Sequence, residues 1–311
     1  MKHNIHIFII VASALFSLAS CEEDITIDTE KGAHKIGIYG YITTDEERHS
    51  ITISRTADFY SKEEIEMISD AQVSIIDLTT TDTILLEETE KGIYQTYPIA
   101  GTIGHSYRLE VTLTDKGETQ HYFAESYIDT CPEKIDSIRI HKYTFFDEVI
   151  DDVYKVCPFF QTTKKDIYYL FDLNINGTSL SDTLSQKARE HLGPLSGLYY
   201  NGKEMEFIFK DLNTYPLGIF YLDQTLIATE QKLDLGDTLE LTIRSIPKGY
   251  YHYLSDISNS IGSNPLMGSP TNVRTNIKGK EKEAVGYFHA ASCIHYTEII
   301  SKLPDEQDET K

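Results

Sequence analysis

The chain has 311 residues, of which 49 are acidic and 28 are basic, and its formal net charge at pH 7 is −21. A surface of this sign repels nucleic-acid phosphates, so the composition argues against DNA or RNA binding. Apolar residues make up 40% of the chain, which is enough for a hydrophobic core, and the length favours two domains over one.

The first 20 residues have the features of a bacterial lipoprotein signal peptide. Lys2 supplies the positive start, residues 5–18 are mostly apolar, and small residues lead to a cysteine in Leu18-Ala19-Ser20-Cys21. The apolar run is shorter than the ~20 residues that span a bilayer, which favours a cleaved export segment over a retained anchor followed by a chance cysteine. We therefore expect residues 1–20 to be removed and Cys21 to be acylated, which would place the protein on a membrane surface outside the cytoplasm.

Residues 21–33 are polar and acidic and are predicted to form a tether. Glu22, Glu23 and Asp24 follow the lipid cysteine directly. Like charges repel, so these carboxylates do not promote adhesion to anionic headgroups. They form either a solvated linker or a sorting signal, because acidic residues at this place resemble the surface-export signal of Bacteroidota lipoproteins.

Residues 34–130 carry the alternation of apolar and polar residues that is typical of β-strands. The predicted strands occupy residues 36–42, 50–54, 71–75, 83–87, 92–97, 107–113 and 122–126. Turn signals such as Asp115-Lys116-Gly117 separate them. About seven short strands in this spacing predict an immunoglobulin-like β-sandwich.

Pro132 marks the predicted boundary to a second domain, residues 132–300, because a strand rarely continues through proline. Alternation resumes over residues 135–143, 166–175, 204–209, 237–245 and 286–295. Asn176-Gly177, a preferred tight-turn dipeptide, ends one of these strands. The charged tail at residues 301–311 lacks periodicity and is expected to be disordered.

One helix is predicted near residues 249–261. Its apolar face consists of Tyr250, Tyr253, Leu254, Ile257 and Ile261. Such a face usually packs against a sheet. The predicted fold is therefore all-β, with two immunoglobulin-like β-sandwich domains, the second of which carries one amphipathic helix.

Cysteine use fits an exported protein. Besides Cys21, the chain has Cys131, Cys157 and Cys293, which allow one disulfide and one remaining thiol. Cys131 and Cys157 are the nearest pair, and closing their loop would stabilise the fold by roughly 3 kcal/mol in the chain-entropy model. The alternative is that all three are small buried apolar residues. No Cys-x-x-Cys occurs, so a redox motif or a cysteine zinc site is not supported.

The motifs of common enzyme classes are missing. The chain has no His-Glu-x-x-His and no phosphate-binding glycine loop, and Gly193-Pro194-Leu195-Ser196-Gly197 has the wrong spacing for a nucleophile elbow. Asp172-x-Asn174-x-Asn176-Gly177 matches the first half of a calcium loop, but position twelve is Thr183 where glutamate is expected. We therefore expect no catalytic residues, no metal site and no cofactor.

Two segments are candidate contact loops, because recognition usually resides in loops. The first places Phe145 and Phe146 beside the acidic Asp147 and Glu148, and its alternative interpretation is a solvated loop. The second places Tyr199-Tyr200 within the polar stretch 179–203, where packing or turns are the alternative.

Several motifs occur in a fixed order along the mature chain: Gly37-Ile38-Tyr39-Gly40-Tyr41-Ile42-Thr43, Asp70-Ala71-Gln72-Val73-Ser74-Ile75, Gly104-His105-Ser106-Tyr107-Arg108-Leu109, Lys134-Ile135-Asp136-Ser137-Ile138, Leu235-Gly236-Asp237-Thr238 and Gly286-Tyr287-Phe288. In this order they resemble the Bacteroidota outer-membrane lipoproteins catalogued as domain of unknown function 4249. The resemblance implies a lipoprotein encoded near TonB-dependent transporters, with only Cys21 mapping to a defined chemical role.

These observations together predict a surface-exposed outer-membrane lipoprotein. We expect a non-catalytic accessory or ligand-binding component of a TonB-dependent nutrient-uptake system. An adhesin or cell-surface assembly subunit is the alternative, since β-sandwiches suit both roles, and a hydrolytic enzyme is a third class. The fold alone does not identify the ligand.

Overall fold

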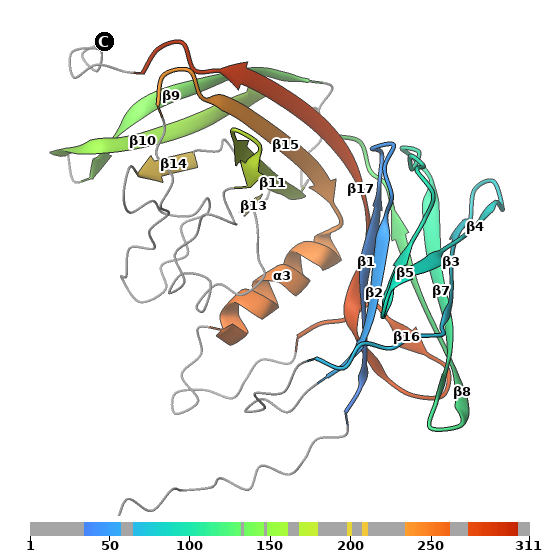
Figure 1. Cartoon of the computed structure of the whole chain (residues 1–311). Coiled ribbons are helices and arrows are strands. Elements are labelled where there is room, and N and C mark those ends of the chain that lie inside the picture. The colour runs from blue at the N-terminus through green and yellow to red at the C-terminus, as the bar shows by residue number, and fades with distance from the viewer. Residues whose placement is uncertain are drawn as a thin grey trace, which may run out of the picture. The chain divides into compact units, whose positions relative to one another are not determined.

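A computed structural model describes residues 34–56, 65–131, 134–145, 148–160, 168–179, 198–200, 207–210, 234–261 and 273–303. Figure 1 shows that these residues form β-strands and one helix, α3 (Lys248–Ile261). The protein is therefore mainly β, and the predicted helix is confirmed. Among the residues described, no helix has both the length and the hydropathy needed to cross a membrane.

The largest sheet has the order β12-β11-β15-β17-β1-β2-β6-β5, with β13 also paired to β11. Its strands are β1 (Ile36–Thr43), β2 (Ser50–Arg55), β5 (Glu87–Glu90), β6 (Ile93–Gln95), β11 (Tyr168–Ile175), β12 (Thr178–Ser179), β13 (Leu198–Tyr200), β15 (Thr238–Ile246) and β17 (Ala284–Ile299). The long strand β17 joins the two halves of this sheet. Its first half pairs in parallel with β1, and its second half pairs antiparallel with β15.

Two smaller sheets complete the architecture. One has the order β16-β8-β7-β3-β4, with β16 (Lys278–Gly279), β8 (Glu118–Tyr127), β7 (Ser106–Asp115), β3 (Gln72–Asp77) and β4 (Thr83–Leu85). The other has the order β14-β10-β9, with β14 (Phe207–Lys210), β10 (Glu148–Phe160) and β9 (Ile135–Phe145).

The predicted tight turns are confirmed by their backbone angles. Lys116 and Gly117, between β7 and β8, have φ values of 51° and 84°. Asn176 and Gly177, between β11 and β12, have φ values of 53° and 76°. Two consecutive positive φ angles match the right-handed twist of the strands that they join, which explains the glycine at the second position of both turns and the asparagine at position 176.

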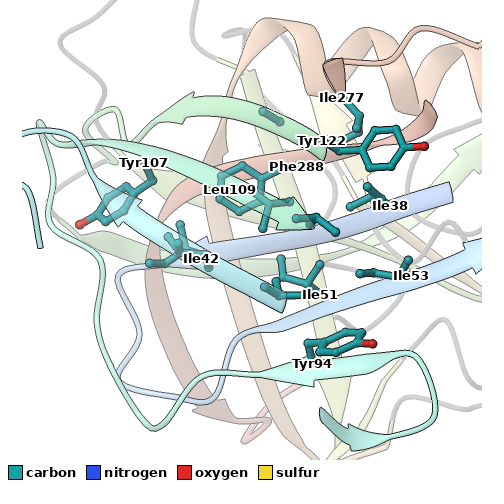
Figure 2. Packing of buried hydrophobic residues seen from close by; sticks show 14 of the residues in the cluster. Ile38, Ile42, Ile51, Ile53, Tyr94, Tyr107, Leu109, Tyr122, Ile277 and Phe288 are labelled. Atoms are coloured by element: carbon teal, nitrogen blue, oxygen red, sulfur yellow. The ribbon is translucent and has the colours of Figure 1, made fainter. Parts of the chain in front are cut away.

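The first core lies between the β1–β2 part of the large sheet and the sheet that contains β7 and β8. Alternate residues of β1, including Ile38 and Ile42, are buried and face Leu109 of β7 (Figure 2). Phe288 of β17 is fully buried in the same cluster. The apolar side chains thus fill a two-layer sandwich, as the alternation predicts.

A second core lies where β11 and β15 meet β9. Its buried members include Leu173 of β11, Leu241 and Ile243 of β15, and Ile135 and Ile138 of β9. In a third cluster, α3 packs on the large sheet. Tyr250 and Leu254 of the helix are buried there together with Leu170, Ile246, Tyr287 and Ala291. The apolar face predicted for the helix is therefore a packing face.

The expected division at Pro132 does not separate the two cores. Ile277, Ala284, Phe288 and Ala290, which lie in the segment assigned to the second domain, are buried in the first core. Strand β17 belongs to both sandwiches, since its residues pair with β1 and then with β15. Alternation identifies the buried face of a strand but not its neighbours in the sheet. The first sandwich is therefore completed by the C-terminal part of the chain.

Candidate functional site

An aromatic cluster occupies the face of the β1–β17 pair that is opposite the first core. The alternation that buries Ile38 and Ile42 turns Tyr39 and Tyr41 to this face. The register places Tyr39 beside Tyr287 and Tyr41 beside His289. Helix α3 adds the rings of Tyr250 and Tyr253. We call this set the tyrosine cluster; its members are Tyr39, Tyr41, Tyr250, Tyr253, Tyr287 and His289.

Close contacts hold the tyrosine cluster together. The rings of Tyr250 and His289 are stacked, with centroids 3.7 Å apart and planes 11° apart. The hydroxyls of Tyr39 and Tyr250 share a hydrogen bond of 2.7 Å. Tyr287 packs against Tyr250 and Tyr253 at centroid distances of 5.4 and 5.1 Å. These contacts fasten α3 to the sheet.

The cluster is uncharged at neutral pH. Burial, followed by the nearby Arg244 charge, lowers the pKa of His289 to about 3. Burial raises the pKa of Tyr253 to about 12 and that of Tyr250 well above its usual value. The imidazole is therefore neutral and the phenols are protonated. Such groups offer hydrogen bonds and flat apolar surface.

A groove of about 1060 Å³ opens on one side of the tyrosine cluster, and we call it the β1 groove. Tyr39 and Tyr253 line it, and Gly37 and Gly286 leave part of the sheet surface bare. Gly286 has a φ of +104°, and a Cβ there would lie 2.0 Å from the Ile38 carbonyl oxygen. Only glycine therefore fits this position.

Three of the four charged side chains that line the β1 groove are paired. Lys35 Nζ lies 2.7 Å from Glu283 Oε2, and Arg55 lies 2.7 Å from both Glu66 and Asp115. The fourth, Lys278, is exposed and lies over the Phe123 ring, 5.7 Å from its centroid. Ile65 and Val273 also line the groove and are exposed. The groove therefore combines aromatic and apolar surface with paired charges and one lysine.

A second groove, of about 760 Å³, lies at the start of α3, and we call it the β15 groove. Tyr127, Tyr168 and Tyr287 line it together with Ser245 and Lys248. Tyr287 belongs to the tyrosine cluster, and Tyr253 of the same cluster lines the β1 groove. Helix α3 therefore contributes a residue to each groove, Tyr253 to the β1 groove and Lys248 to the β15 groove.

The candidate contact loops are described only in part. Phe145 ends β9 and pairs with Glu148 at the start of β10, while Phe146 and Asp147 lie outside the described residues. Tyr199 and Tyr200 form part of β13 and pair with Leu170 and Tyr169 of β11. The side chains of Phe145, Glu148, Tyr199 and Tyr200 are likewise outside the description, so their role as contacts stays a prediction.

The cysteines considered for a disulfide are described in part. Cys131 is a free thiol, and its Sγ donates a 3.5 Å hydrogen bond to the Ile243 carbonyl oxygen. Burial raises the pKa of Cys131 and of Cys293 to about 12. Both half-buried thiols are therefore protonated at neutral pH and behave as small apolar groups, whereas the state of Cys157 stays a prediction. Cys21 lies outside the described residues, as does the side chain of Cys157.

Sequence reasoning did not find the two grooves. Tyr127, Tyr168 and Tyr287 come from β8, β11 and β17, which do not pair with one another, and only the packing of two sheets brings them to one place. The available signal was the composition, with 21 tyrosines and no tryptophan. Such a composition indicates half-buried strands equally well. Among the residues described, no three His, Cys, Asp or Glu side chains converge as a metal site would need.

The family described as Domain of unknown function (DUF4249) matches residues 22–294. The chain belongs to this family. No curated protein matches it. Among solved structures, it is similar to the β-glucuronidase of Parabacteroides merdae with glycerol in its active site, at 10% identity and a TM-score of 0.21. That likeness covers 70% of this chain and 23% of the glucuronidase, and at this TM-score it carries no argument.

Proposed function

We propose that this member of the DUF4249 family is a lipid-anchored outer-membrane protein displayed on the cell surface. In this proposal it is a non-catalytic accessory or ligand-binding component of a TonB-dependent nutrient-uptake system. The signal-like sequence that ends at Cys21 and the acidic residues after it support the location.

The observation that carries the proposal is the short stretch of sequence between Cys21 and the β1 groove. Lys35, which lines this groove, lies 14 residues after Cys21. A flexible chain of that length spans about 20 Å on average. Lipidation of Cys21 would therefore hold the groove close to the membrane and raise its effective concentration toward other membrane proteins.

The surface of the β1 groove suits a protein partner. Ile65 is 63% exposed and Val273 is 36% exposed at its rim, beside the partly exposed ring of Tyr39. Apolar side chains that gather at one exposed place mark interaction sites more often than scattered ones do. An aromatic residue beside them is typical of the centre of protein interfaces.

The test is affinity purification of the tagged full chain from solubilised outer membranes. We expect a TonB-dependent transporter to copurify, and Ile65→Asp to reduce its recovery at least tenfold because the charge opposes burial of the rim. Leu235→Asp is the matched control, since Leu235 is also 63% exposed but does not line the β1 groove. Cys21→Ala should abolish incorporation of labelled palmitate.

Two results would contradict the proposal. One is palmitate labelling that persists in the Cys21→Ala variant. The other is the absence of any transporter from the purified material, together with turnover of a substrate by the pure protein.

A further inference from the structure

We propose that the β15 groove binds a neutral saccharide, through stacking on its tyrosines and hydrogen bonds to its serines. The groove is distinct from the β1 groove, to which the membrane partner is assigned. The inference concerns the ligand alone and does not depend on a transporter.

A buried hydroxyl at this groove lacks a partner. Ser245 lines the groove at the end of β15 and is only 2% exposed. Its Oγ forms no hydrogen bond with any described residue. Most buried polar groups in native proteins are paired, so an unpaired one calls for an explanation. A ligand hydroxyl would supply the missing partner if the Ser245 side chain turned toward the groove.

The tyrosine rings at the groove are of two kinds: two are held in place by neighbouring rings, and one is exposed. Tyr287 is held between Tyr250 and Tyr253, and Tyr168 packs on Tyr251 with centroids 4.8 Å apart. These rings are fixed by their neighbours. Tyr127 on β8 is 49% exposed and faces the same groove. Sugar rings have apolar C–H faces and polar edges, so they match a surface on which flat rings alternate with hydroxyls.

The charges of the groove favour a neutral ligand. The Glu125 carboxylate lies 3.1 Å from Arg108 Nε, which compensates it. Asp129 and Lys248, of opposite sign, also line the groove. The two carboxylates disfavour an anion, and Lys248 at the helix start disfavours a cation. A polyhydroxylated neutral molecule avoids both costs.

The size of the groove favours more than a single sugar ring. Its volume of about 760 Å³ falls in the upper part of the roughly 300–1,000 Å³ range of ligand pockets. An oligosaccharide can place one ring against Tyr127 and another against Tyr168, since Tyr287 is only 7% exposed. We therefore expect affinity to rise with chain length.

The test is isothermal titration of the full chain, purified in detergent, with maltohexaose, cellohexaose, xylohexaose and laminarihexaose. Hexagalacturonate serves as the acidic probe and a casein digest as the peptide probe. We expect at least one neutral hexasaccharide to bind, and Tyr127→Ala to weaken binding at least tenfold. Tyr97→Ala is the matched control, because Tyr97 is 58% exposed and does not line the groove.

Ser245→Ala separates a ligand contact from a structural role. Because the hydroxyl has no partner among the described residues of the free protein, its removal should leave the melting temperature unchanged or higher while saccharide binding falls. Binding of none of the neutral probes would overturn the inference, as would equal binding of the acidic or peptide probe, or equal effects of the Tyr127 and Tyr97 variants. Transporter recovery with Tyr127→Ala should remain normal, which keeps this test independent of the proposed function.

Discussion

At the scale of single residues, His289 shows how the cluster depends on charge state. It is only 3% exposed, stacks on Tyr250, and has an Nδ1 atom without a partner among the described residues. Arg244 is the charged group that acts on it, and Tyr39 and Tyr41 are its aromatic neighbours. A proton on this imidazole would face burial and a like charge, so protonation opposes folding.

This arrangement predicts acid sensitivity. The pKa of His289 is about 3 in the folded state, against about 6.5 for an unfolded histidine. The unfolded chain therefore binds the proton first, and the stability contribution of neutral His289 is complete above pH ~6.5 and is lost as the pH falls toward 3. Its share of the slope reaches ~1.4 kcal/mol per pH unit. Urea unfolding between pH 7 and pH 4 should show a smaller loss for His289→Phe, which keeps a stacked ring.

The same substitution at His121, a half-buried histidine on β8, is the control. It shows whether a change in slope belongs to His289 or follows the replacement of any half-buried histidine. Equal slopes for the wild type and His289→Phe would show that the burial of this imidazole does not govern acid stability.

At the scale of elements, the sequence predicts helix α3 but not the surface on which the helix packs. The spacing of Tyr250, Tyr253 and Leu254 identifies the packing face from sequence, and the structure buries Tyr250 and Leu254 against the sheet. The partner surface depends on β17, whose parallel pairing with β1 joins segments about 250 residues apart. The alternation of apolar and polar residues within a strand does not identify the strand with which it pairs. The grooves beside α3 were therefore outside the reach of sequence reasoning.

The contact between α3 and β17 predicts a glycine requirement. A Cβ at Gly249 would lie 2.2 Å from the Tyr287 hydroxyl oxygen. That ring is packed between Tyr250 and Tyr253 and cannot move freely. Overpacking typically costs ~1–3 kcal/mol, which exceeds the gain of at most ~1 kcal/mol from higher helix propensity. Gly249→Ala should therefore lower the free energy of unfolding, measured by urea titration with circular dichroism.

Tyr287→Phe provides the matched rescue for that variant. It removes the clashing oxygen, and the next nearest ring atom is 3.5 Å from the added Cβ. The double variant should recover most of the lost stability. A double variant as unstable as Gly249→Ala alone would locate the cost elsewhere in the helix.

At the scale of the whole molecule, the two sandwiches share one strand. The sequence indicated two sandwich-forming segments, and the strand-rich class is confirmed by the described residues. The interdependence of the segments was not predicted, because Phe288 and Ala290 serve the first core from near the end of the chain. Composition and turn signals are local, whereas this dependence is set by a long-range pairing.

A fragment of residues 34–130 should therefore fail to fold by itself, although the sequence marks it as a domain. Without β17, the β1 strand loses its parallel partner and exposes an apolar edge, and the first core loses Ile277, Phe288 and Ala290. We expect the fragment to lack a cooperative thermal transition by circular dichroism and to aggregate. Joining residues 273–300 to it through a Gly/Ser linker should restore cooperative unfolding, because that segment supplies both the missing strand and the missing core side chains. If the short fragment alone unfolds cooperatively, its core tolerates the loss of β17, and the boundary predicted at Pro132 would separate an independent domain after all.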